Sequence, residues 1–273
     1  MPGCARIRSG MTKRYAVLGS PISHSKSPII HTAAFKALGV DAEYLAVEVK
    51  DELAAFISAQ PADRLGFSVT MPLKEQALNL AERADFLAIA TGAANTLIRT
   101  EGGWDAYNTD VFGIQMALAG RKFKSVCVLG TGATARSAVV AMQELEKNVS
   151  IWGRSASSLK QLTAEYEIEP IAQLHKAWST DLVISTLPPK ALDEHLSALK
   201  QAPKGLLLDV AYDPWPSEAA KLWGDANTIS GLEMLIWQAV GQQRLFAGND
   251  LSEALPNEKE LVLAIRSALD MAK

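Results

Sequence analysis

One stretch decides the fold of this chain's second half: Val126-Cys127-Val128-Leu129-Gly130-Thr131-Gly132-Ala133-Thr134-Ala135. Its first four residues form a continuous apolar run, which is typical of a strand buried on both faces of a parallel sheet. Two glycines follow directly, and Thr134 to Leu145 then has the composition of a helix. A strand that passes through a glycine-rich turn into a helix is typical of a dinucleotide-binding domain.

The residues of this turn have separate physical tasks. Gly130 permits the tight turn, and Gly132 lets the backbone approach a pyrophosphate, which then meets free N–H groups at the positive end of the helix. We therefore predict cofactor contacts from Gly130, Thr131, Gly132, Ala133, Thr134 and Ala135. The simpler alternative is a plain glycine-rich turn, but the strand before it and the helix after it favour the cofactor.

The end of the next expected strand, Val149–Trp152, indicates which cofactor is used. An acidic residue there would hold a ribose 2′-hydroxyl and favour NAD. The chain instead has Gly153-Arg154-Ser155, and a guanidinium beside a hydroxyl suits a 2′-phosphate. We therefore predict NADP, with Thr186 and Gly231 as further contacts; the alternative is that Arg154 is an ordinary exposed loop arginine.

The rest of the second half continues the same pattern. After the glycine loop we expect a helix at 157–166 and strands at 182–185 and 206–209, which together form a doubly wound array. Two helices, Leu232–Phe246 and Glu258–Met271, end the chain.

The first half also alternates strands and helices. Strands are expected at 15–19, 43–49 and 66–70, and helices at 28–38, at 53–59 and from Pro72 onward. This order predicts a mostly parallel sheet covered by helices. Residues 96–99 and 104–107 flank Glu101-Gly102-Gly103 and predict a hairpin.

The two series of elements predict an α/β protein with two domains. We expect an amino-terminal α/β substrate domain of residues 11–109 plus 231–273 and a Rossmann-type NADP-binding domain of residues 110–230. The last helices are thus expected to return to the first domain. Residues 1–10 contain no apolar segment of a signal peptide and are expected to be a disordered extension.

Composition narrows the choice of partners. The chain has 273 residues, of which 48% are hydrophobic and 21% charged, and a net charge of −3, so no basic field favours nucleic acid. No apolar run reaches the roughly 18 residues that a membrane helix needs. Cys4 and Cys127 do not suggest a disulfide framework. We expect a cytoplasmic protein, a monomer or homodimer, without a metal site.

Five further motifs resemble those of the shikimate dehydrogenase family, in the family's order and over nearly the whole chain. They are Gly19-Ser20-Pro21-Ile22-Ser23-His24-Ser25-Lys26-Ser27-Pro28, Val69-Thr70-x-Pro72-x-Lys74, Gly92-Ala93-Ala94-Asn95-Thr96, Asn108-Thr109-Asp110 and Gly231-Leu232-x-Met234-Leu235-x-x-Gln238-Ala239. The resemblance implies reversible, NADPH-dependent reduction of 3-dehydroshikimate to shikimate, a step toward chorismate and the aromatic amino acids.

The resemblance also implies a role for each matching residue. Lys74 and Asp110 are the expected catalytic pair. Expected substrate contacts are Ser25 and Ser27 with the carboxylate, Thr70, Asn95 and Gln238 with ring hydroxyls, and Tyr212 near the carboxylate or the nicotinamide.

The residue chemistry agrees with these roles. Ketone reduction needs a hydride from the cofactor and a proton for the oxygen, and a lysine can donate that proton while stabilising a developing alkoxide. A simpler reading exists for each residue: Lys74 as a solvated helix lysine, Asp110 as a helix N-cap, and Ser25 and Ser27 as caps of the helix that Pro28 opens. The remaining polar residues are equally compatible with ordinary turn, strand-end and helix-face positions.

The chain departs from the family's pattern at three places. The family usually has asparagine where Ser68 stands, and often a second adjacent glycine where Ala133 stands. Its cofactor clamp is often Asn-Arg-Thr with a second arginine where this chain has Ser158. We therefore expect weaker discrimination against NAD than is usual.

Two other functions remain open at this point. A quinate/shikimate dehydrogenase with a broader substrate range often uses NAD, which an acidic residue at the end of the second strand would indicate. A non-catalytic NADP-binding sensor needs the Gly130 loop, but it has no need of Lys74 together with Asp110.

Overall fold

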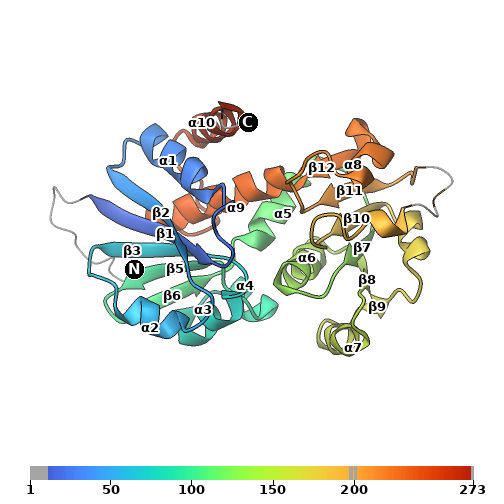
Figure 1. Cartoon of the computed structure of the whole chain (residues 1–273), viewed down its shortest axis with the longest axis horizontal. Coiled ribbons are helices and arrows are strands. Elements are labelled where there is room, and N and C mark those ends of the chain that lie inside the picture. Colours follow the sequence, from blue (N-terminus) through green and yellow to red (C-terminus); the bar gives the residue numbers. More distant parts are fainter. Residues whose placement is uncertain (1–11, 197–198, 200–201, 272–273) are drawn as a thin grey trace. The chain divides into compact units, whose positions relative to one another are not determined.

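The computed structural model describes residues 12–196, 199 and 202–271. The expected extension, residues 1–10, and with it Cys4 lie outside the described residues. The chain forms two compact α/β units, one of Met1–Phe112 with Ile236–Lys273 and one of Gly113–Leu235 (Figure 1). It passes between them within two helices, α5 (Asp110–Ala117) and α9 (Gly231–Phe246).

The first unit is built on a mixed sheet. Its strands are β1 (Lys13–Gly19), β2 (Ala42–Glu48), β3 (Arg64–Val69), β4 (Arg83–Ala84), β5 (Thr96–Thr100) and β6 (Gly103–Tyr107), in the spatial order β2-β1-β3-β5-β6-β4. Strands β1, β2 and β3 are parallel, whereas β5 runs antiparallel to both of its neighbours. The expected hairpin therefore forms, and it extends the parallel strands into a mixed sheet.

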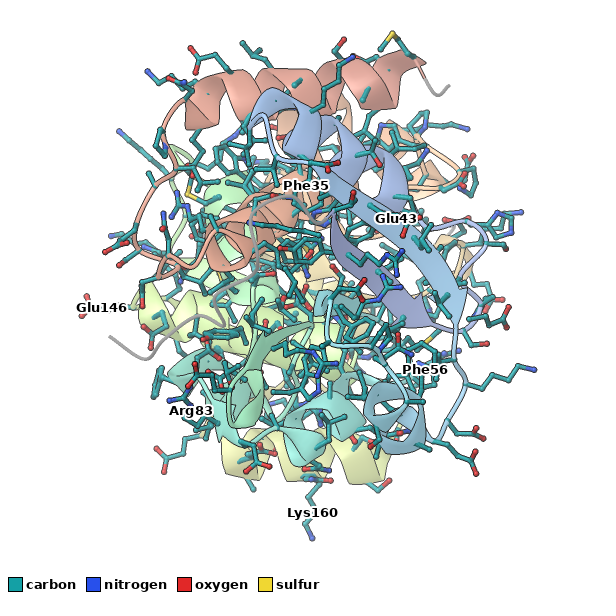
Figure 2. All side chains as sticks on the ribbon, turned by 90° about the vertical axis from the view of Figure 1, so that its left-hand side faces the viewer. Phe35, Glu43, Phe56, Arg83, Glu146 and Lys160 are labelled. Carbon is teal, nitrogen blue, oxygen red and sulfur yellow. The ribbon has the colours of Figure 1, made fainter. Side chains whose placement is uncertain are left out.

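Alternation along β1 supplies apolar side chains to both faces of this sheet. Tyr15 and Val17 belong to a cluster with Tyr44, Phe246 of α9 and Phe35 of α1 (Ser27–Ala37). Phe35 is labelled in Figure 2. The next helix, α10 (Glu258–Met271), packs along α1 (Figure 1). The end of the chain thus completes the core of the unit that the start of the chain begins.

The opposite face of the sheet is covered by three shorter helices. They are α2 (Leu53–Ser58), α3 (Lys74–Leu80) and α4 (Phe86–Thr91). Helix α3 begins at Lys74 and not at Pro72 as expected, because Leu73 closes a turn by donating its N–H to the Thr70 carbonyl at 2.9 Å. Helix α4 was not expected, although Asp85 caps it by accepting the N–H of Ala88 at 2.7 Å.

The second unit has the doubly wound arrangement that the glycine loop predicted. Its strands are β7 (Ser125–Leu129), β8 (Asn148–Trp152), β9 (Glu169–Pro170), β10 (Leu182–Ser185), β11 (Leu206–Asp209) and β12 (Thr228–Ser230), all parallel, in the order β12-β11-β10-β7-β8-β9. Helices α6 (Ala133–Glu144), α7 (Ala156–Glu165) and α8 (Glu218–Trp223) connect them. The chain order reverses between β7 and β10, where such sheets bind ligands at the carboxyl ends of their strands.

Candidate functional site

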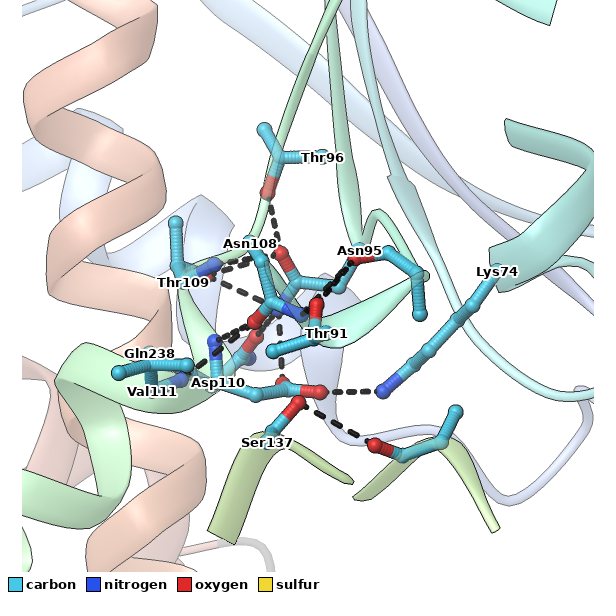
Figure 3. A network of polar contacts seen from close by, with 12 residues as sticks. Lys74, Thr91, Asn95, Thr96, Asn108, Thr109, Asp110, Val111, Ser137 and Gln238 are labelled. Carbon is cyan, nitrogen blue, oxygen red and sulfur yellow. Dashed lines mark hydrogen bonds and ion pairs between the residues drawn. The ribbon is translucent and has the colours of Figure 1, made fainter. Parts of the chain in front are cut away.

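Lys74 and Asp110 form an ion pair in the first unit. Lys74 is the first residue of α3 and Asp110 the first of α5. The Lys74 Nζ lies 2.5 Å from the Asp110 Oδ2, and the two side chains are only 13% and 6% exposed (Figure 3). The fold therefore brings together two residues that are far apart in sequence, and Lys74 is not the solvated helix lysine of the simpler reading.

The second carboxylate oxygen of Asp110 is held from the other side. The Asn95 Nδ2 donates to the Asp110 Oδ1 at 2.8 Å and to the Gln238 Oε1 at 3.0 Å. Both amides are buried, Asn95 just before β5 and Gln238 on α9. Four of the expected site residues thus form one contiguous polar group (Figure 3).

The start of α5 explains the orientation of Asp110. The Asn108 Oδ1 accepts the backbone N–H of Asp110 at 3.0 Å and that of Val111 at 3.4 Å. The Asn108 Nδ2 donates to Thr91 and to the Ala93 carbonyl, which anchors the turn. Asn108 is therefore the capping residue, whereas the Asp110 carboxylate is directed at Lys74 and Asn95 instead of its own helix.

The two serines lie at the start of α1. The Ser25 Oγ accepts the Ser27 N–H at 3.3 Å, so it contributes to the helix start as the simpler reading expected. The buried Ser27 interacts with the Tyr44 hydroxyl, which also donates to the Ser68 Oγ at 2.5 Å. Thr70 follows β3, and its N–H bonds to the Leu18 carbonyl at 2.8 Å.

A buried histidine lies behind this group, and sequence reasoning missed it. The His31 Nε2 is 3.0 Å from the Gln242 Oε1, and its Nδ1 is 2.8 Å from the Gln243 Nε2. Complete burial lowers the pKa of His31 from 6.5 to about 3, although the bond to Gln242 opposes this shift. Spacing was the available signal, because Gln242 lies one turn after Gln238 and His31 one turn after Ser27 on their helices.

The lowered pKa of His31 makes the stability of the fold depend on pH. Between pH 3 and 6.5 the unfolded chain binds a proton at His31 that the folded protein does not, so the free energy of unfolding falls as pH drops below 6.5. At most about 1.4 kcal/mol is lost per pH unit. Urea unfolding measures how far the free energy of unfolding falls from pH 7 to pH 5. We expect this fall to be about 2 kcal/mol smaller in His31→Gln than in the unmodified protein. The exposed His24, changed to Gln, is the control and should leave the loss unchanged.

The glycine loop lies between β7 and α6 in the second unit. Gly130 has φ +121°, and a Cβ added there would lie 2.3 Å from the Thr186 Oγ1, so only glycine fits. A Cβ on Gly132 would meet no atom within 4 Å, so packing does not require this glycine. Gly132 precedes α6 without a side-chain cap. Its open backbone beside the helix N-terminus fits the phosphates of a dinucleotide.

The residues after β8 include the expected contacts of a 2′-phosphate, Arg154 and Ser155. Arg154 is exposed, and Ser155 caps α7 by accepting the Ser158 N–H at 3.3 Å. The hydroxyls of Ser157 and Ser158 lie 3.1 and 2.9 Å from that of Ser155. Exposure of Arg154 is compatible with phosphate binding and also with an ordinary loop arginine.

Two other expected residues follow β11 in the chain, Tyr212 in the segment after this strand and Gly231 as the first residue of α9. A Cβ on Gly231 would lie 2.1 Å from the Val210 carbonyl oxygen, so close packing accounts for this glycine, and its cofactor contact stays a prediction. Tyr212 is half-buried, and burial, with the charge of Asp213, raises its pKa. In the described part of the chain, no group of three or more His, Cys, Asp and Glu side chains could hold a metal ion.

No helix within the described ranges is long and apolar enough to cross a membrane.

Two family models match the chain. A model described as the shikimate dehydrogenase substrate binding domain matches residues 17–97, and one described as NADP oxidoreductase coenzyme F420-dependent matches residues 125–212. The NADP-dependent shikimate dehydrogenase of Ignicoccus hospitalis is 31% identical over 253 residues, which cover 86% of this chain and 93% of that protein.

Solved structures of shikimate dehydrogenases are similar to this chain along nearly its whole length. Shikimate dehydrogenase of Mycobacterium tuberculosis gives a TM-score of 0.82 at 35% identity, covering 93% of this chain and 99% of that one. Shikimate 5-dehydrogenase of Thermus thermophilus, solved in complex with NADP(H) and shikimate, gives 0.80 at 30% identity and covers 94% and 100%.

Proposed function

The chain belongs to the shikimate dehydrogenase family, and from this premise we propose that Lys74 and Asp110 are the catalytic pair of an NADP-dependent enzyme. The enzyme is an oxidoreductase that interconverts 3-dehydroshikimate and shikimate with NADPH and NADP. The observation that carries the assignment of the pair is the contact of a nearly buried lysine with a carboxylate whose other oxygen is held by an amide.

The proposed mechanism assigns one task to each of these side chains. When bound, NADPH supplies the hydride for the carbonyl carbon. The Lys74 ammonium donates its proton to the carbonyl oxygen, so the alcohol forms and a neutral lysine remains, which is protonated again from water. Asp110 holds Lys74 through its Oδ2, and Asn95 fixes Asp110 through its Oδ1. In the oxidative direction the neutral lysine accepts the same proton.

We propose that the remaining expected residues of the first unit bind the substrate. Ser25 and Ser27 take the carboxylate at the start of α1, where the helix dipole favours an anion. Thr70, Asn95 and Gln238 take the ring hydroxyls, and Tyr212 of the second unit serves the carboxylate or the nicotinamide. The contact of Asn95 with both Gln238 and Asp110 supports this assignment, because hydroxyl binding and catalysis then share one amide.

In the second unit, the glycine loop and α6 would hold the pyrophosphate, and Arg154 with Ser155 would hold the 2′-phosphate. Arg154→Ala should therefore raise the KM for NADP by about tenfold or more and leave the KM for NAD almost unchanged, because one charge-assisted contact is lost. Steady-state kinetics with both cofactors measure this. Lys160→Ala, at an exposed position of α7, is the control. An equal rise for both cofactors would mean that Arg154 supports the loop and does not bind the phosphate.

One assay tests the function as a whole. Shikimate and quinate are each incubated with NADP and with NAD, and formation of the reduced cofactor is followed by its absorbance. We expect turnover of shikimate with NADP to be the fastest of the four. Faster turnover of quinate with NAD would favour the broader quinate/shikimate enzyme, and cofactor binding without any turnover would favour a sensor.

We also propose a cytoplasmic enzyme that works as a monomer or homodimer.

A further inference from the structure

Gln242 lies behind the proposed catalytic group and uses all four hydrogen-bonding positions of its amide. It is 1% exposed. Its Oε1 accepts from the His31 Nε2 at 3.0 Å and from the Ser68 Oγ at 2.9 Å. Its Nε2 donates to the Asn95 carbonyl at 3.1 Å and to the Thr96 Oγ1 at 2.9 Å. An amide with two acceptors and two donors engaged has only one favourable orientation.

The partners of the Gln242 oxygen set that orientation. The Gln243 Nε2 can only donate to the His31 Nδ1, so the His31 Nε2 carries the proton and donates to Gln242. Burial keeps His31 neutral, which preserves this tautomer. The Ser68 hydroxyl receives a hydrogen bond from Tyr44 and donates its own proton to Gln242. Two donors therefore face the oxygen and leave the amino group pointing at Asn95 and Thr96.

The orientation continues from Gln242 toward the catalytic pair. Because Thr96 accepts from Gln242, its own proton is free to donate to the Asn95 Oδ1, which lies 2.8 Å away. The Asn95 amino group then faces Asp110 and Gln238 (Figure 3). Thr109 donates to the same Asn95 oxygen from its N–H at 2.9 Å and from its Oγ1 at 3.2 Å, so Thr96 supplies the shortest of three orienting bonds.

We propose that Gln242 is a positioning residue for the Lys74–Asp110 pair and acts through Thr96 and Asn95. The inference deepens the proposed function, since it rests on the assignment of this pair. Loss of Gln242 leaves the Thr96 hydroxyl free to rotate away from Asn95 and so weakens one of the bonds that orient Asn95. The expected effect is a fall of about tenfold in kcat.

A double-mutant cycle tests this inference. Gln242→Met keeps the length of the side chain and removes its hydrogen bonds, and Thr96→Val keeps the shape and removes the hydroxyl. kcat is measured with both substrates saturating, so that changes in affinity do not contribute. We expect each single variant to lose about tenfold and the double variant to lose no more than either single one. Multiplied losses, or an unchanged kcat in either single variant, would overturn the proposal.

Gln243→Met is the matched control. Gln243 is the same residue type on the same helix, is also 1% exposed, and bonds to His31 but not to Thr96 or Asn95. We expect a lower thermal stability and a much smaller loss of kcat than in Gln242→Met, because Ser68 still donates to the Gln242 oxygen when the His31 tautomer is no longer fixed. Equal losses of kcat in Gln242→Met and Gln243→Met would indicate a general packing effect and overturn the proposal.

Two further variants keep the test decisive. If Gln242→Met does not fold, Thr96→Ser, which retains the hydroxyl, should keep most of the kcat that Thr96→Val loses; equal losses would contradict the proposal. Lys74→Ala distinguishes a failure of the proposed catalytic pair from a failure of the proposed role of Gln242. If that variant keeps its kcat, the assignment of the catalytic pair fails, whatever the coupling between residues 242 and 96.

Discussion

Replacing Lys74 with alanine lowers kcat by about two orders of magnitude or more, with a smaller effect on substrate binding. This is the expected result because the Lys74 ammonium acts mainly in the transition state, where it donates a proton and stabilises negative charge on the oxygen. The variant also leaves the Asp110 carboxylate without its lysine partner in a nearly buried position. Steady-state kinetics with shikimate and NADP measure the loss.

Two controls accompany the Lys74 variant. Lys36→Ala removes an exposed lysine from α1 of the same unit and should leave kcat unchanged. Thermal unfolding establishes that the Lys74 variant is folded at the assay temperature. A folded Lys74→Ala enzyme with near-normal kcat would remove this lysine from the mechanism.

A second large effect is expected from Arg244, which joins α9 to the start of α10. Its Nε and Nη2 lie 2.8 and 2.6 Å from the two carboxylate oxygens of Glu258, and the side chains are 8% and 15% exposed. Arg244 also donates to the Leu251 carbonyl and lies over the Phe112 ring. Arg244→Met leaves a nearly buried carboxylate unpaired, so we expect the free energy of unfolding to fall by about 3–5 kcal/mol.

Urea or thermal unfolding measures this loss of stability. Two further variants test whether the loss comes from the buried ion pair. Arg244→Met combined with Glu258→Leu removes both charges and should recover part of the lost stability. Lys221→Met breaks the exposed ion pair with Glu218 and should cost about 0.5 kcal/mol or less. A loss for Arg244→Met as small as that for Lys221→Met would contradict the assignment of a buried, stabilising pair.

The parts of the fold that depend on local pattern were predictable from the sequence. The β7 strand, the glycine loop and α6 follow one another within a short segment, so apolar runs and glycines specify them together. The antiparallel pairing of β5 with β3 was not predictable in this way, because strand order depends on contacts between distant segments. The two-residue strands β4 and β9 are too short to show a period in the sequence.

The residues of the proposed site also differ in whether the sequence could predict them. The resemblance pointed to Lys74, Asp110, Asn95 and Gln238, and the structure places them in one hydrogen-bonded group. Gln242 was missed, because α9 carries several polar side chains and a glutamine among them is equally compatible with a solvent-facing position. Only the packing of α9 against the first sheet shows that its amide is buried and fully bonded.

The position of Phe246 in the core of the first unit has a consequence for synthesis on the ribosome. The strands that begin this core emerge first, but the aromatic cluster around Tyr15 stays incomplete until α9 has left the exit tunnel. The all-parallel sheet of the second unit needs no segment beyond residue 235. The second unit can therefore fold during translation. The first unit begins to be synthesised earlier, but its core is completed last.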